Sequence, residues 1–198
     1  MKQIAIFASG TGTNTKKIIG YFHNHPAIRI SLIASDKPAA GVLNIAWENS
    51  IPSLILEKEK FSQGNAYVDE LRERKIDFIV LAGFLKKVPG ALVKAFRGQI
   101  LNIHPALLPK YGGKGMYGLH VHEAVIAGGE KETGITIHLV DELYDHGQVV
   151  FQAGCEVDPS DTPETLAAKV HLLEYEYFSK IIEEVVLSEA ISPRPLNK

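Results

Sequence analysis

Two polar side chains on one expected strand have the chemistry needed for acyl transfer. Residues 101–109 read Leu-Asn-Ile-His-Pro-Ala-Leu-Leu-Pro, which puts Asn102 and His104 two positions apart. On a strand they face the same side, and they stand at its carboxyl end, where open α/β sheets bind their ligands. An asparagine amide donates a hydrogen bond, and a histidine carries a mobile proton near neutral pH. The pair therefore suits a carbonyl that becomes a tetrahedral oxyanion, although a buried polar pair that ties down a loop has the same pattern.

A downstream acidic loop can complete this arrangement. Residues 141–147 read Asp-Glu-Leu-Tyr-Asp-His-Gly, and Asp145 precedes a tight turn that can direct its carboxylate inward. If this carboxylate reaches His104, it favours the imidazolium and raises the pKa of the ring. An acid would then be available at physiological pH. Because acidic loops are usually solvated hairpins, this role depends on the distance between the two side chains.

A glycine-containing segment near the start of the chain indicates anion binding. Residues 9–14 read Ser-Gly-Thr-Gly-Thr-Asn and stand between an apolar strand and a helix. Glycines allow a sharp turn there, and the N–H groups at the start of a helix can hold a phosphate. A dinucleotide fingerprint needs a third glycine where Thr15 stands, so that alternative is incompletely matched, although Asp36 stands near the place of a ribose-binding acid. A plain strand-to-helix turn is equally compatible with this segment alone.

The elements that position these groups follow an α/β pattern. Short β-branched runs alternate with longer mixed segments, which is typical of βαβ units and a parallel sheet. The expected strands cover residues 4–8, 28–34, 52–56, 77–82, 100–103, 134–140 and 148–156. The first expected helix follows the glycine-containing segment and ends near Tyr21. The other expected helices cover residues 39–48, 64–74, 119–127 and 163–187, and Thr162 is the expected N-cap of the last one. We expect a single-domain, three-layer α/β sandwich over residues 1–190, with a mostly parallel, Rossmann-like sheet, a mixed C-terminal part and a tail at 191–198.

The composition of the whole chain limits its function. A net charge of −2 over 198 residues, without a basic block, argues against a nucleic-acid partner. The one cysteine, Cys155, forms no intramolecular disulfide or cysteine cluster and is expected in the core. The apolar run at the N-terminus is too short for a signal or membrane segment, so a cytoplasmic protein is expected. His23 with His25 and His120 with His122 have ligand-like spacing but no third ligand nearby, so we expect no metal and exposed positions at helix ends.

Taken together, these segments resemble the glycinamide ribonucleotide formyltransferases, a family of folate-dependent formyltransferases, over nearly the full chain. The resemblance is carried by residues 8–14, 80–84, 102–110, 133–138 and 141–147. It implies that a formyl group passes from 10-formyltetrahydrofolate, a consumed co-substrate, to the amine of 5-phosphoribosylglycinamide in purine synthesis. It also implies small-molecule substrates, no metal, no membrane partner, and a monomer or homodimer.

The resemblance assigns roles residue by residue. The catalytic trio is Asn102, His104 and Asp145. The residues that match the family's binding site for the phosphate and the rest of the ribonucleotide are Gly12, Thr13, Asn14, His171, Leu172, Leu173 and Glu174. Those that match its folate-binding site are Leu85, Lys86, Lys87, Val88, Asn102, Asp141, Glu142, Leu143, Tyr144 and Asp145. The sequence departs from the family pattern in two places. Residues 62–65 lack an arginine that contacts the folate in some members. The loop at 111–118 is longer than in many members, and it is either a mobile lid or a surface insertion.

Several other functions compete with this interpretation. Another formyl-folate enzyme, such as a formyltetrahydrofolate hydrolase or a formyltransferase with a different amine acceptor, shares the Asn-x-His-Pro segment. Hydrolases and methionyl-tRNA formyltransferases usually add a domain that 198 residues do not accommodate, and sugar-nucleotide formyltransferases are normally longer. A nucleotide-binding module without catalysis would not need His104. A metal hydrolase built on the histidine pairs would need bound metal.

Overall fold

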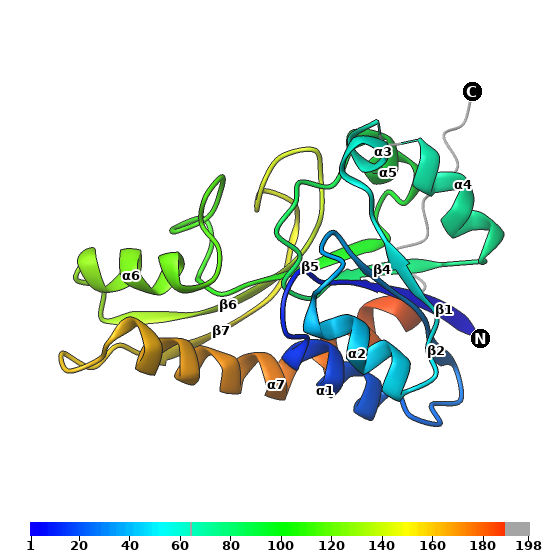
Figure 1. Cartoon of the computed structure of the whole chain (residues 1–198). Helices are drawn as coiled ribbons and strands as arrows, with labels where there is room; N and C mark the ends of the chain where they lie inside the picture. Colours follow the sequence, from blue (N-terminus) through cyan, green and yellow to red (C-terminus); the bar gives the residue numbers. More distant parts are fainter. Residues whose placement is uncertain (64, 189–198) are drawn as a thin grey trace.

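The computed structural model describes residues 1–63 and 65–188, which form one seven-stranded sheet with helices on both faces (Figure 1). The strands are β1 (Lys2–Phe7), β2 (Ile28–Ser35), β3 (Ser53–Ile55), β4 (Phe78–Leu81), β5 (Ile100–His104), β6 (Glu132–Leu139) and β7 (Val149–Glu156). The helices are α1 (Thr13–Tyr21), α2 (Gly41–Glu48), α3 (Lys58–Ser62), α4 (Ala66–Glu73), α5 (Gly90–Ala95), α6 (Leu119–Ala127) and α7 (Pro163–Leu187). The expected tail at 191–198 and the end of the expected domain at 189–190 lie outside the described residues.

The sheet changes character between its fifth and sixth strands. Its order is β3-β2-β1-β4-β5-β6-β7. All pairs from β3 to β5 are parallel, whereas β6 is antiparallel to β5 and β7 is antiparallel to β6. Parallel neighbours need long crossovers, which the helices of the first half supply, while a short loop suffices between β6 and β7. The predicted mostly parallel sheet with a mixed C-terminal part is confirmed.

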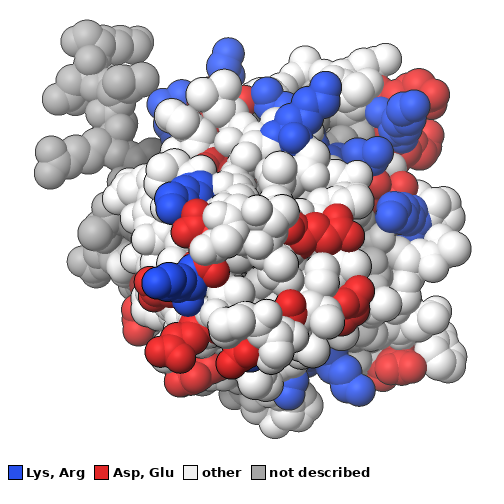
Figure 2. Space-filling model, turned by 90° about the vertical axis from the view of Figure 1, so that its left-hand side faces the viewer, with Lys and Arg blue, Asp and Glu red and all other residues white. Residues whose placement is uncertain are grey.

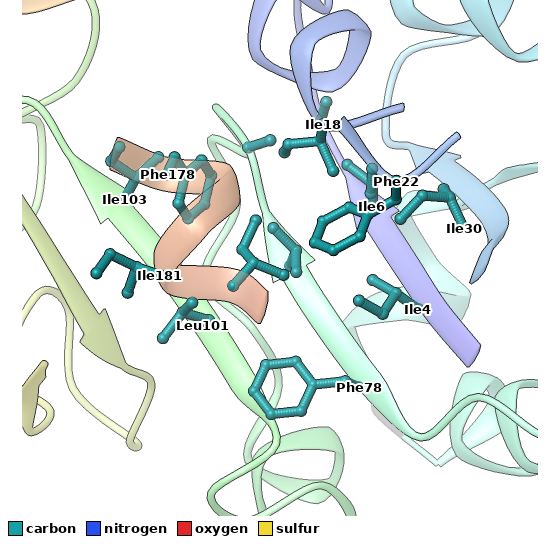
Figure 3. Close-up of a cluster of buried hydrophobic side chains, with 14 of the residues drawn as sticks. Ile4, Ile6, Ile18, Phe22, Ile30, Phe78, Leu101, Ile103, Phe178 and Ile181 are labelled. Atoms are coloured by element: carbon teal, nitrogen blue, oxygen red, sulfur yellow. The ribbon is translucent and has the colours of Figure 1, made fainter. Parts of the chain in front are cut away.

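Two hydrophobic layers cover the sheet. On the face of α1, α2 and α7, Leu101 and Ile103 of β5 belong to the same buried cluster as Phe178 and Ile181 of α7 (Figure 3). A second cluster fills the face of α3, α4 and α5. Because side chains alternate along a strand, Asn102 lies on the face opposite to Leu101 and Ile103. The packing of β5 on α7 therefore directs the polar side chains of β5 away from this core.

Helix α7 begins where the sequence indicates. The N–H of Thr165 donates to Oγ1 of Thr162 at 3.3 Å, the N–H of Thr162 donates to Oγ1 of Thr165 at 2.9 Å, and Pro163 occupies the first turn. This reciprocal capping satisfies two N–H groups that a helix start otherwise leaves unpaired. The helix then packs on β5, β6 and β7 and against α1 and α6. It thus brings residues from late in the chain to the carboxyl end of β5.

Two short helices were not predicted, and several boundaries differ from the expected ones by one or two residues. α3 has five residues and α5 has six, which is under two turns, so neither shows a helical period in the sequence. The helix expected over 64–74 begins at Ala66, and its expected first residue, Gly64, lies outside the described residues. No helix in the described part of the chain is long and apolar enough to cross a membrane. Basic and acidic side chains are interspersed on the face drawn in Figure 2.

The β6–β7 hairpin depends on a close backbone approach at Gly134. A Cβ atom added to Gly134 would lie 1.9 Å from the carbonyl oxygen of Ala153 on β7. We predict that Gly134→Ala lowers the free energy of unfolding by about 1–3 kcal/mol, because the two strands must separate. Urea unfolding of the purified protein measures this.

The matched control is Gly90→Ala. Gly90 is exposed at the start of α5, and an added Cβ meets no atom within 4 Å there. The free energy of unfolding of this variant should equal that of the wild type or exceed it by up to about 1 kcal/mol, because alanine has a higher helix propensity than glycine. Equal stabilities of the two variants would contradict the strand-approach argument.

Candidate active site

A cavity of about 720 Å³ opens at the carboxyl ends of the parallel strands. Its walls come from the loops after β1, β4 and β5, from the glycine-rich loop 113–118, and from one side of α6 and α7. Ligands of open α/β sheets bind at this edge, and the volume is in the usual range for small-molecule sites. The three segments that the sequence analysis treats as chemically important all meet here.

Asn102 is held by a histidine on the neighbouring antiparallel strand. The register pairs Asn102 with His138, and Nδ2 of Asn102 lies 3.0 Å from Nε2 of His138. Nδ1 of His138 lies 3.0 Å from the carbonyl oxygen of Leu139, which only accepts, so Nδ1 carries the hydrogen and Nε2 accepts from Asn102. An amide nitrogen has two hydrogens, so one remains for a ligand in the cavity. His138 is not among the predicted site residues. The one signal in the sequence that could have identified it is its alternation with apolar residues on the expected strand.

Both ring nitrogens of His104 have partners within the protein. The side chain is 3% exposed, and Nε2 lies 2.7 Å from the carbonyl oxygen of Tyr111, so Nε2 carries a hydrogen. Nδ1 lies 3.6 Å from Oδ2 of Asp145. A second proton on the ring is therefore bound at Nδ1, facing this carboxylate.

The pKa of His104 lies below its ordinary value. Burial, which disfavours the charged ring, is the largest cause, while the charge of Asp145 and the carbonyl of Tyr111 act in the opposite direction. Asp145 therefore reaches His104 and acts in the expected sense. The expected net rise is wrong because the loss of solvent around the ring outweighs the carboxylate.

Asp145 is placed by an unusual backbone conformation and by three neighbours. Its φ angle of 49° lies in the left-handed region, where aspartate is found more often than most residues. Its carboxylate accepts from the N–H of Gly113 at 2.9 Å and lies 3.7 Å from Nε2 of His138. Burial raises the pKa of Asp145, but the charge of His104 and the Gly113 N–H act in the opposite direction, and the pKa lies below its ordinary value. The carboxylate is therefore ionised at neutral pH.

The turn at residues 111–113 connects the two halves of this network. The carbonyl of Tyr111 accepts from His104, and the N–H of Gly113 donates to Asp145. The Tyr111 hydroxyl donates to Glu130 at 2.9 Å, which anchors the turn to the connection between α6 and β6. Residues 113–118 line the cavity. This loop is therefore part of the wall of the site.

The segment predicted to bind a phosphate has the geometry that the glycines suggest. Gly12 precedes α1 with a φ of +83°, and a Cβ there would lie within 3.0 Å of Val42 and Ile45. Nδ2 of Asn14 donates to Oε2 of Glu174 at 2.9 Å, although 160 residues separate them. His171 lies 2.8 Å from the same oxygen, and this hydrogen bond raises the pKa of His171. The first turn of α1 and the middle of α7 therefore form one corner of the cavity.

The segments predicted to hold the folate meet on the other side of His104. Leu85, Lys86 and Tyr144 line the cavity. The Nζ atom of Lys87 lies 5.7 Å from the ring centre of Tyr144, so the two loops are neighbours.

Oγ of Ser9 accepts from the N–H of Leu85 at 2.9 Å and donates to Asp36 at 2.5 Å. Asp36 is thus engaged in tying β1, β2 and β4 together, which removes support from the dinucleotide alternative.

Some predicted residues lie outside the cavity lining. Val88 is buried in the core, Leu173 packs against the other core cluster, and Leu172 is exposed. Asp141 accepts from the N–H of Leu143 and contacts His146, which shapes the loop. The remaining predicted residues outside the lining are Lys87, Glu142 and Leu143.

Two expectations about histidine and cysteine side chains have different outcomes. The expectation that both histidine pairs are exposed is wrong for His25, whose side chain is 14% exposed and contacts Glu183, and for His122, which is 3% exposed and lies on a helix that packs against α7. Cys155 is half-buried beside the core, and burial raises the pKa of its thiol. In the described part of the chain, no three His, Cys, Asp or Glu side chains are grouped so as to hold a metal ion.

Comparisons with known proteins agree with this geometry. Residues 2–182 match the family model described as formyl transferase. The chain is 42% identical to the chloroplastic phosphoribosylglycinamide formyltransferase of Arabidopsis thaliana over 92% of this chain and 66% of that relative. It is 34% identical to phosphoribosylglycinamide formyltransferase of Bacillus subtilis over 94% of this chain and 95% of that relative. It therefore spans just under two thirds of the plant relative and nearly all of the bacterial one.

A solved structure extends the likeness to three dimensions. The phosphoribosylglycinamide formyltransferase from Bacillus halodurans has a TM-score of 0.85 and 37% identity, with 96% of this chain and 97% of that chain covered. The region matched by the family model contains all the cavity residues described above. The chain therefore belongs to the formyl transferase family, among the phosphoribosylglycinamide formyltransferases.

Proposed function

We propose that this enzyme transfers the formyl group of 10-formyltetrahydrofolate to the amine of 5-phosphoribosylglycinamide, a step of purine synthesis. The observation that carries the proposal is the position of Asn102, His104 and Asp145 between two different walls of one cavity. One wall has a helix start and the Asn14–Glu174–His171 cluster, which suit a phosphate and a ribose. The other has Leu85, Lys86 and Tyr144, which suit a flat pterin ring.

The proposed reaction is a direct attack of the neutral amine on the formyl carbon. This forms a tetrahedral oxyanion, to which the second N–H of Asn102 donates. His104, protonated at Nδ1 against Asp145, stabilises the oxyanion by its charge, and it supplies a proton when its Nε2–H turns from the carbonyl of Tyr111 to the substrate. One such donor typically contributes ~10²–10³ in rate, and a placed acid contributes ~10²–10⁴. The remainder comes from holding both substrates in one cavity.

Asp145 is proposed to set how much of His104 is protonated. A buried imidazole with a depressed pKa is a strong acid, but little of it carries the proton at neutral pH. The carboxylate at 3.6 Å partly offsets burial and increases the protonated fraction. A proton passes from the attacking nitrogen through water to the folate nitrogen, which departs as a neutral amine, while the tetrahedral oxygen returns its proton to His104 and the carbonyl reforms.

The proposed substrate contacts follow the two walls. Gly12, Thr13 and Asn14 bind the phosphate with the N–H groups of the first turn of α1. His171 and Glu174 bind the ribose. Both residues line the cavity, and the bonds from Asn14 and His171 to Oε2 of Glu174 fix the carboxylate at the cavity wall. The loops at 85–88 and 141–145 cradle the pterin. The cytoplasmic location and the choice between monomer and homodimer stay predictions from the sequence.

We predict that His104→Ala lowers kcat/KM for formyl transfer roughly 10²–10⁴-fold, because the acid at the reacting centre is lost. The assay incubates 10-formyltetrahydrofolate with the enzyme, with and without 5-phosphoribosylglycinamide, and follows loss of the formyl group spectroscopically. His23→Ala, which removes an exposed histidine, is the control and should leave the rate unchanged. Formyl loss that does not require the ribonucleotide would instead identify a hydrolase.

We also predict a change of pH dependence in Asp145→Asn. Without this charge the protonated form of His104 is less stable, so the pKa of His104 falls further. A rate that needs the protonated ring is lost as the pH rises through that pKa, so the alkaline fall of kcat/KM moves to lower pH. A shift of one pH unit reduces the rate above the pKa by about tenfold.

Asp158→Asn is the matched control for this experiment. Asp158 is exposed in the turn between β7 and α7, where it accepts from Ser160. Its pH profile should follow that of the wild type. An Asp145→Asn profile with the same midpoint and only a lower plateau would contradict the proposed role of the charge.

A further inference from the structure

Helix α6 carries two histidines in opposite environments. The side chain of His120 is 64% exposed and lies 3.1 Å from Glu123, one turn along the helix. His122 is 3% exposed, and its Nδ1 atom has no hydrogen-bond partner among residues 1–63 and 65–188. Burial of an unpaired polar atom costs free energy, and folded proteins retain few of them. His122 therefore has hydrogen-bonding capacity that the described residues leave unused, and a bound molecule is one source of a partner.

The location of His122 identifies where that partner binds. Thr15 and Thr133 also have unpaired buried hydroxyls, but neither residue lines the cavity. His122 does line it, together with Leu119 of the same helix and Ala167, His171 and Glu174 of α7. A molecule in the cavity is therefore in reach of this side chain.

His122 is near residues from both ends of the proposed ribonucleotide site. Its ring interacts electrostatically with His171 and Glu174 and also with His104. Glu174 is bound to Asn14, next to the proposed phosphate site. A substrate that extends from the phosphate site to the reacting centre at His104 therefore comes near His122.

We propose that His122 binds the ribonucleotide by hydrogen bonding to its ribose or glycinamide portion. The inference rests on the proposed function and adds a contact to it. Burial, and then the nearby charge of His171, lower the pKa of His122, so the ring is neutral at physiological pH. A neutral imidazole offers one donor and one acceptor, which suits a hydroxyl or an amide.

The test compares three variants with the wild type. His122→Phe keeps an aromatic ring but removes both nitrogens, His122→Gln restores a donor and an acceptor, and His120→Phe makes the same change at the exposed position. We expect His122→Phe to raise KM for 5-phosphoribosylglycinamide on the order of tenfold, the effect of one lost hydrogen bond in a buried site. KM for 10-formyltetrahydrofolate should stay unchanged, His122→Gln should recover part of the loss, and His120→Phe should match the wild type.

A thermal measurement separates binding from folding. Because His122→Phe removes an unpaired polar atom, its Tm without ligand should equal or exceed that of the wild type. The rise in Tm caused by the ribonucleotide alone should be smaller than in the wild type. A lower Tm of the free variant together with equal rises of both KM values would show a structural role and overturn the inference.

The outcomes also separate this inference from the proposed function. Wild-type turnover that requires the ribonucleotide, combined with an unchanged KM in His122→Phe, overturns the inference alone. A wild-type protein that neither binds nor formylates the ribonucleotide overturns the proposed function and the inference with it. Wild-type turnover with a selective rise of KM in His122→Phe supports both.

Discussion

The site depends on β5 having a parallel neighbour on one side and an antiparallel neighbour on the other. The parallel neighbours end at the same edge as β5, so their exit loops surround the carboxyl end of that strand. The antiparallel strand β6 runs back from this edge and pairs His138 with Asn102 and Thr136 with His104. A wholly parallel sheet would place another exit loop there. The reversal instead supplies side chains that hold Asn102 and His104, the proposed catalytic pair, from within the sheet.

Thr136 shows how far this support extends. Its hydroxyl donates to the carbonyl of Ala106 at 2.7 Å and accepts from the N–H of Leu108 at 2.9 Å. Gln152 on β7 donates to Oγ1 of Thr136 at 2.8 Å. The loop that leaves His104 is therefore bonded to the two strands beside it. His104 stands at the start of a fixed segment, so the position of its backbone does not depend on the glycine-rich residues 114–118.

Two buried carboxylates organise the cavity in the same way. Asp145 lies against His104 and His138, and Glu174 lies against Asn14 and His171. A carboxylate removed from water needs partners, and in both cases histidine and amide or backbone donors supply them. The surroundings give the histidines opposite properties. His171 is partly exposed and gains a raised pKa from its carboxylate, whereas burial lowers the pKa of His104 despite Asp145.

Local patterns predicted the parts of this molecule that depend on neighbours in sequence. The alternation around Asn102 and His104, the turn at Gly12 and the cap at Thr162 all follow from a few adjacent residues, and the structure has them where expected. The burial of His122 depends on α6 packing against α7, and the contact of Asn14 with Glu174 joins the two ends of the chain. The pKa of His104 depends on how much solvent the whole fold removes. Such quantities are sums over distant segments, so no short stretch of sequence contains them.

The turn at residues 111–113 has a consequence for how the loop can vary in length. Its first residue accepts from His104 and its last donates to Asp145, so an inserted residue between His104 and Gly113 would carry one of these backbone groups out of reach. Residues 114–118 make neither contact, and Gly115 and Gly118 have positive φ angles with open space around them. Lengthening or shortening of the loop is therefore confined to the part after Gly113. The shape of the cavity mouth can therefore change without moving the backbone groups that hold His104 and Asp145.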